Sequence, residues 1–230
     1  GQIYAKVATD PADGQRMVAR VLRAGGRLPE EWTLYQNLPA AIADSAFRWS
    51  GQAQVQAILG LDLAAETDFK KATARSGEPR AAQAYAEFLV SRGRAEEALP
   101  LVQAAYRERT LLDREDEQLA LRRTMITVHL ALGQLEEARN VGGLPSGATA
   151  LRGAIAYAAG DFDFAASQFR AALETGDEPG LAALGAAACL ARAGQWKEAY
   201  DAFQALAERD PYLRARALGG AALVLERRQK

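Results

Sequence analysis

The stretch GDFDFAASQFRAAL, residues 160–173, has a close counterpart in GQWKEAYDAFQAL, residues 194–206. In both stretches, a glycine is followed by small or bulky apolar residues five, nine and twelve positions later. These are Ala165, Phe169 and Ala172 after Gly160, and Ala199, Phe203 and Leu206 after Gly194. Steps of four and three place such residues on one face of a helix. We expect the glycine in the turn before that helix, where a left-handed backbone costs it little.

The same spacing occurs earlier in the chain. It gives Ala65, Phe69 and Ala72 after Gly60, Ala98, Val102 and Ala105 after Gly93, and only Ala138 after Gly133. The glycines recur roughly every 34 residues, which is typical of a two-helix repeat. We assign the long interval before Gly133 to an insertion, RERTLLDREDEQ (107–118), and the short interval after it to the loss of most of a second helix. A generic Ala-rich bundle is the alternative.

This pattern resembles the tetratricopeptide repeat (TPR) family, in which a turn glycine precedes Ala, an aromatic residue, Ala and a proline. GQWKEAYDAFQALAERDP (194–211) matches it most fully, and Trp49 and Gly153 also stand where the family prefers Trp and Gly. The resemblance implies an all-α fold, a right-handed α-solenoid of TPR-like helix pairs with terminal capping helices. Residues 1–44 would be an N-terminal cap or degenerate repeat, 45–210 the solenoid and 211–230 a C-terminal capping helix.

The helix boundaries follow from capping signals and proline positions. The first helix is expected within 11–26, with Met17, Val18, Val21 and Leu22 on one side, and a second helix runs from Pro29 until Pro39 interrupts it. The predicted pairs are 40–58 with 62–75, 79–92 with 95–109, 116–132 with 135–141, 147–159 with 162–175, and 180–193 with 196–208, followed by a solitary last helix. Ser146, Asp177 and Asp210 are expected to cap the helices that follow them.

Composition restricts the class of protein. The 230 residues carry a net charge of −1, so no global field favours nucleic acid or an anionic membrane. Cys189 is the only cysteine, which excludes an internal disulfide, and no apolar run approaches the roughly 18 residues of a membrane span. The chain begins GQIYAKVATDP without Met, so we expect a removed segment or a cloned boundary, and either a cytoplasmic or an exported protein. Its Ala- and Arg-rich usage hints at a bacterial source.

No catalytic or cofactor motif emerges from the sequence. His129 is the single histidine, and a partly buried, hydrogen-bonded imidazole is favoured over a catalytic base. Cys189 lies among small helical residues, which favours a buried thiol over a nucleophile. The glycine clusters lack the spacing of a phosphate loop. We therefore expect a non-enzyme without metal or cofactor.

The resemblance implies that the first helix of each pair lines a concave surface. The groove positions that it assigns here are Arg80, Gln83 and Glu87, then Arg123 and Thr127, then Tyr157, and finally Leu181, Leu184 and Arg192. The first half of this surface is polar, and the second is small and apolar. An apolar inner surface needs a cover, either a bound segment or the chain's own last helix. Some family members bind the C-terminal carboxylate of a chaperone through a set of Lys and Asn residues. This chain lacks that set.

These observations predict a non-enzymatic adaptor that binds a protein, as an extended peptide or a helix, in its groove. A self-associating assembly module that forms homo-oligomers is one alternative. A regulatory repeat region cut from a larger protein is another.

Overall fold

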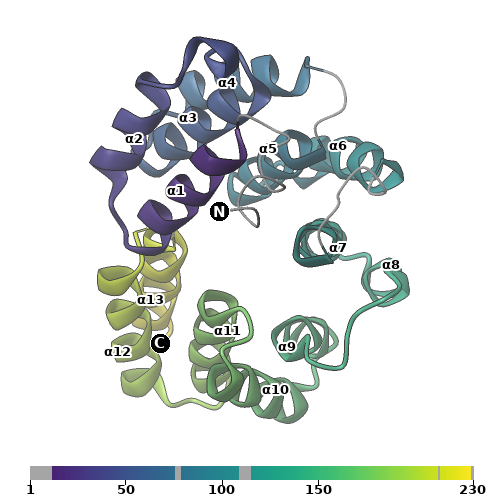
Figure 1. The fold of residues 1–230 in the computed structure, drawn as a ribbon. Coiled ribbons are helices and arrows are strands. Elements are labelled where there is room, and N and C mark those ends of the chain that lie inside the picture. The colour runs from purple at the N-terminus through teal and green to yellow at the C-terminus, as the bar shows by residue number, and fades with distance from the viewer. Residues whose placement is uncertain (1–11, 76–78, 109–114, 212, 229–230) are drawn as a thin grey trace, which may run out of the picture. The chain divides into compact units, whose positions relative to one another are not determined.

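The computed structural model describes residues 12–75, 79–108, 115–211 and 213–228. These residues form helices connected by short turns, and no strand is found among them. The chain divides into two compact units, residues 1–128 and 129–230. Each unit is built from helices that pack against their neighbours in sequence (Figure 1). The all-helical prediction is therefore confirmed.

The first unit contains α1 (Asp13–Ala24), α2 (Leu28–Gln36), the 3-10 turn η2 (Ala40–Ile42), α3 (Ala46–Ile58), α4 (Asp62–Thr73), α5 (Pro79–Ser91), α6 (Ala95–Arg107) and most of α7 (Glu115–Ala131). The second contains α8 (Leu135–Asn140), α9 (Thr149–Ala158), α10 (Phe162–Thr175), α11 (Pro179–Arg192), α12 (Trp196–Arg209) and α13 (Arg214–Arg228). Helix α3 pairs with α4, α5 with α6, α9 with α10 and α11 with α12. Part of the predicted insertion, residues 109–114, lies outside the described residues, as do residues 1–10, which the sequence suggested were extended or loose.

The turns within the pairs have the predicted geometry. Gly60, Gly93, Gly133, Gly160 and Gly194 all have φ between +71° and +84°. A side chain at φ values of this kind is strained, which explains why a glycine recurs before each second helix.

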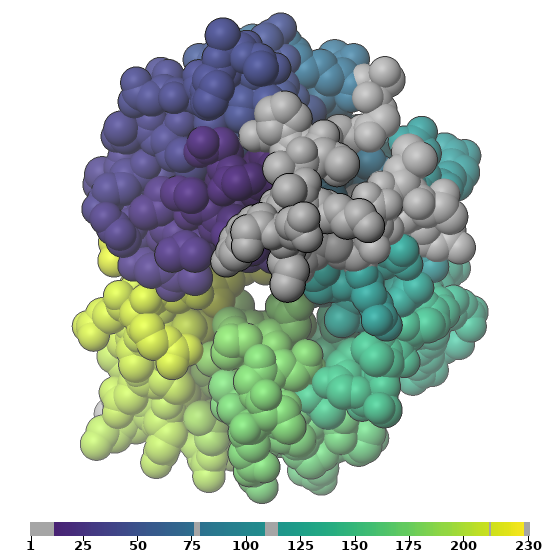
Figure 2. Space-filling view, viewed as in Figure 1, coloured from purple at the N-terminus to yellow at the C-terminus, as the bar shows by residue number. Residues whose placement is uncertain are grey.

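In three of the pairs, an aromatic residue nine positions after the turn glycine lies in the core: Phe69, Phe169 and Phe203. Phe169 is 2% exposed and lies between α9 and α11. A Cβ added to Gly153 of α9 would lie 2.9 Å from its ring, and one added to Gly185 of α11 would lie 2.2 Å from it. Helices α9 and α11 can approach the Phe169 ring closely because Gly153 and Gly185 have no side chain at these positions. Helices α10 and α11 contact each other, and their atoms form a continuous green region in the space-filling view (Figure 2).

Two of the predictions for the N-terminal helices need correction. In α1, Met17, Val18 and Val21 are 54%, 45% and 63% exposed, and of the predicted apolar side only Leu22 is buried. The helix expected from residue 40 begins at Ala46, because the Ser45 side chain accepts the Arg48 N–H at 3.2 Å and caps it there.

Two of the three predicted caps are wrong. Ser146 does not cap α9, which begins at Thr149. Asp177, expected to cap α11, instead serves the N-terminus of α9. Its Oδ2 accepts the Ala150 N–H at 2.8 Å and the Thr149 hydroxyl at 3.0 Å. Helix α10 returns antiparallel to α9, which brings its C-terminal end beside the start of α9. Asp210 accepts the Leu213 N–H at 3.3 Å before α13, as predicted.

Candidate functional site

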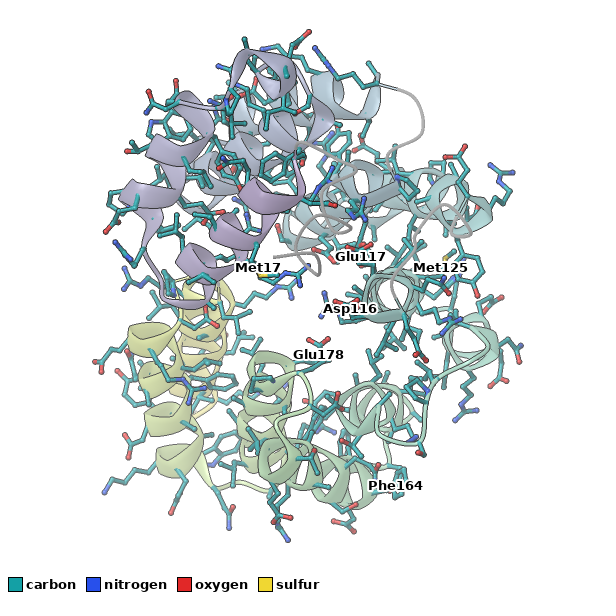
Figure 3. The ribbon with its side chains drawn as sticks, viewed as in Figure 1. Met17, Asp116, Glu117, Met125, Phe164 and Glu178 are labelled. Atoms are coloured by element: carbon teal, nitrogen blue, oxygen red, sulfur yellow. The ribbon has the colours of Figure 1, made fainter. Side chains whose placement is uncertain are left out.

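The polar positions assigned to the groove come together between α5 and α7. Glu87 is the centre of this cluster: its Oε1 accepts hydrogen bonds from the Thr124 hydroxyl at 2.6 Å and from the Gln83 amide at 3.1 Å. The Arg123 guanidinium lies 3.6 Å from the same oxygen. Arg80 forms an ion pair with Glu117 of α7, which is directed toward α5 in Figure 3.

This arrangement pairs the charged groups of the cluster with one another. Two arginines face two carboxylates, so the pairs cancel in charge, and Glu117 is only 14% exposed. Thr127 is different, because its hydroxyl donates to the Arg123 carbonyl of its own helix at 2.9 Å. A ligand that displaced these contacts would break two partly exposed ion pairs, at a cost of up to about 1 kcal/mol each. The two ion pairs of the cluster therefore carry no net charge.

Sequence reasoning missed Glu117 and Thr124. Both lie on α7 beside positions that it did identify. Glu117 stands two helical turns before Thr124, a spacing that keeps both residues on one face. That periodicity was readable in the sequence, but it did not show which of these side chains meet α5.

The second group of positions surrounds Tyr157 at the end of α9. Its ring packs edge-on against Phe162, with centroids 5.2 Å apart. The Arg192 guanidinium lies over the Phe162 ring at 4.4 Å. Burial raises the pKa of Tyr157, while the positive charges of Arg192 and Arg227 act in the opposite direction. Tyr157, Phe162 and Arg192 are called the aromatic site below.

Phe162 was not among the predicted residues, although the sequence carries a signal for it. It stands two positions after Gly160, and Trp196 stands two positions after Gly194. An aromatic residue that recurs at the start of the second helix marks a ring held against the end of the first helix.

Leu181 and Leu184 separate into different clusters. Leu181 packs, with Tyr157, against the buried residues of α9 to α11. Leu184 packs against the cluster formed by α11, α12 and α13, which includes Ala217, Ala221 and Val224 of the last helix. The chain's own C-terminal helices thus cover part of the apolar surface around Leu184.

His129 is hydrogen bonded and Cys189 is buried. His129 Nδ1 forms a hydrogen bond with the Gln134 side-chain oxygen at 2.8 Å, as the prediction of a satisfied imidazole required. Cys189 is 8% exposed, and burial raises the pKa of its thiol. Within the described ranges, no group of three His, Cys, Asp or Glu side chains could hold a metal ion.

None of the helices in the described ranges is both long and apolar enough to cross a membrane. No protein-family model matches the chain, and no curated protein is significantly similar to it.

Proposed function

We propose that the chain is a non-enzymatic interaction scaffold of the TPR type. Its helix pairs would stack as a right-handed α-solenoid, and the first helices would line a concave surface that binds an extended peptide or a helix of another protein. The recurring turn glycines and the buried residues spaced from them support this assignment.

The observation that carries the proposal is the aromatic site. Tyr157 is only partly buried, and in the part of the chain that the structure describes no residue hydrogen bonds to its hydroxyl. Aromatic rings with one apolar face and one polar end are typical anchors of protein interfaces. Arg192 is exposed beside them. This combination suits a ligand with an apolar side chain to pack against Tyr157 and Phe162 and a carboxylate to pair with Arg192.

The polar cluster between α5 and α7 would serve selectivity. Its charges are paired with one another, so a ligand gains little by approaching them with a single charge. A ligand segment with small or uncharged side chains leaves the Glu87 and Arg80 contacts intact, whereas a charged one must disturb them.

Selection from a phage-displayed random peptide library tests the proposal. Peptides enriched on the wild-type chain should bind the Arg192→Glu variant at least about tenfold more weakly, because attraction between the arginine and the ligand carboxylate is replaced by repulsion. Arg170→Glu is the matched control, since Arg170 is an exposed arginine of α10 outside the aromatic site. Far-UV circular dichroism should be the same for all three proteins. Equal binding to both variants would refute the assignment.

Self-association is a second candidate, favoured by the outer surface of α13. Leu218 and Leu225, which stand two helical turns apart on one face of α13, are 43% and 42% exposed. Exposed large apolar side chains on one face of a helix are typical of an interface between protein copies. Sedimentation velocity should then show a concentration-dependent dimer that Leu218→Glu abolishes. A monomer at all concentrations would exclude this candidate.

A further inference from the structure

The second helix of one repeat is missing its final turns. Helix α8 has 6 residues, whereas the equivalent helices α4, α6, α10 and α12 have 12, 13, 14 and 14. The first of its repeat positions, Ala138, is fully buried as in the other repeats. The positions that should carry an aromatic and a small residue are Gly142 and Pro145, and both lie in the non-helical connection to α9.

A hollow of about 300 Å³ lies beside the end of α8. Its apolar walls come from Ile155 and Ala159 of α9 and from Phe164 of α10, and Arg139 and Arg152 are at its rim. Phe164 is 48% exposed and projects from α10 into solvent (Figure 3). In the α10 and α12 repeats, the aromatic residue nine positions after the turn glycine is buried. The α8 repeat has no such side chain.

Arg139, Arg152 and Asp161 are the charged residues that line the hollow. The Arg152 guanidinium donates to the carbonyl oxygens of Pro145 and Ser146, which leaves its charge without a carboxylate there. Arg139 forms an ion pair with Glu136, but both side chains are about half or more exposed and such pairs contribute little. Asp161 also lines the hollow, and its Oδ1 is occupied by the Phe164 N–H.

We propose that this hollow is a docking site for a short helix of a partner protein. The partner segment, of about two turns, would occupy the place of the missing end of α8. A bulky apolar side chain would pack against Ile155 and Phe164, a small residue three positions later would face α9, and an acidic residue would pair with Arg152. The site shares no residue with the aromatic site, so it is a second binding surface rather than an extension of the first.

The probe for this site is available in the chain itself. The α12 sequence WKEAYDAFQALAER, residues 196–209, carries the full pattern that α8 lacks, including acidic residues. As a synthetic peptide with blocked ends, it should bind the intact protein with a Kd between about 10 μM and 1 mM, because ordering so short a helix costs affinity. The same peptide with Phe203→Asp is the matched control and should not bind.

Two measurements decide the location and chemistry of binding. The methyl signal of Ile155 should shift in NMR spectra as the peptide is added. Phe164→Ser should weaken binding at least about tenfold, and Arg152→Gln should weaken it less and reduce its salt dependence. Leu173→Ser controls for the loss of an exposed apolar side chain, because Leu173 is 44% exposed on the same helix and lies outside the hollow.

Three outcomes would overturn the proposal. The first is no binding at about 1 mM peptide. The second is NMR signal shifts confined to α11 and α13, as expected if the peptide displaced α12. The third is an equal effect of Phe164→Ser and Leu173→Ser on binding. Arg192→Glu should leave binding of this peptide unchanged. Failure here is therefore distinguishable from failure of the aromatic site.

Discussion

Two adjacent glycines in the last helix provide a sharp test of how the helices pack. Gly219 and Gly220 both lie inside α13, and they differ in what a methyl group would meet. A Cβ at Gly219 would have no atom within 4 Å. A Cβ at Gly220 would lie 2.6, 2.7 and 2.9 Å from three ring atoms of Phe203. Phe203 is 5% exposed, so its ring has little room to move.

The expected stability changes follow from two opposing effects. Replacing a glycine by alanine inside a helix stabilises it by about 0.8–1 kcal/mol. Overpacking a filled core costs about 1–3 kcal/mol. Gly219→Ala should therefore raise the free energy of unfolding by about 1 kcal/mol, and Gly220→Ala should lower it by up to about 2 kcal/mol. The gain in helix propensity is common to both variants, so their difference isolates the steric cost.

Urea unfolding followed by far-UV circular dichroism measures this difference. Helical repeats can unfold in more than one step, so the comparison should use the midpoint at which signal from the second unit is lost. The order should be Gly219→Ala above wild type and wild type above Gly220→Ala. If Gly220→Ala proved as stable as Gly219→Ala, the close approach of α13 to Phe203 would be wrong.

Three further predictions concern single side chains. Asp177→Ala should destabilise the chain by about 1 kcal/mol through loss of the Ala150 cap, with little effect from Asp177→Asn, as urea midpoints would show. Arg94 and neighbouring donors hold the pKa of Glu66 at about 2, below its unfolded value, so the stabilisation is present above about pH 4.5 and is lost as pH falls toward 2. Glu66→Gln should reduce the loss of unfolding free energy between pH 4.5 and pH 2 by about 1 kcal/mol. If the unfolding free energy of this variant depended on pH as in the wild type, the ion pair would be contradicted. Cys189 should react with a disulfide reagent at least about a hundredfold more slowly in the native protein than in urea.

The repeated spacing in the sequence was sufficient to predict most of the helices. Residues such as Phe69, Phe169 and Phe203 are buried because they share one offset from a turn glycine, and that offset is visible without coordinates. Capping was predictable only where the cap is local. Asp210 acts on the next helix, but Asp177 reaches back to α9 across a whole helix pair, and no local signal encodes such a contact.

The candidate site shows what the sequence leaves out. The family resemblance assigned Arg80, Glu87 and Arg123 to a groove, but it did not reveal that Arg80 pairs with Glu117 and Arg123 with Glu87. The hollow beside α8 shows the same limit. The shortened interval after Gly133 indicated a lost helix, yet the exposed ring of Phe164 and the position of Arg152 depend on how α9 and α10 pack.

The central claim is that a peptide binds at the aromatic site, and one binding isotherm tests it most directly. A peptide selected on the wild-type chain would be titrated against wild type and Tyr157→Phe, which differ by one hydroxyl group that lacks a hydrogen-bond partner among the described residues. Loss of a ligand hydrogen bond of about 1 kcal/mol predicts a Kd about fivefold higher for Tyr157→Phe, with unchanged circular dichroism. The same Kd for both proteins, or no peptide enriched at all, would contradict the claim.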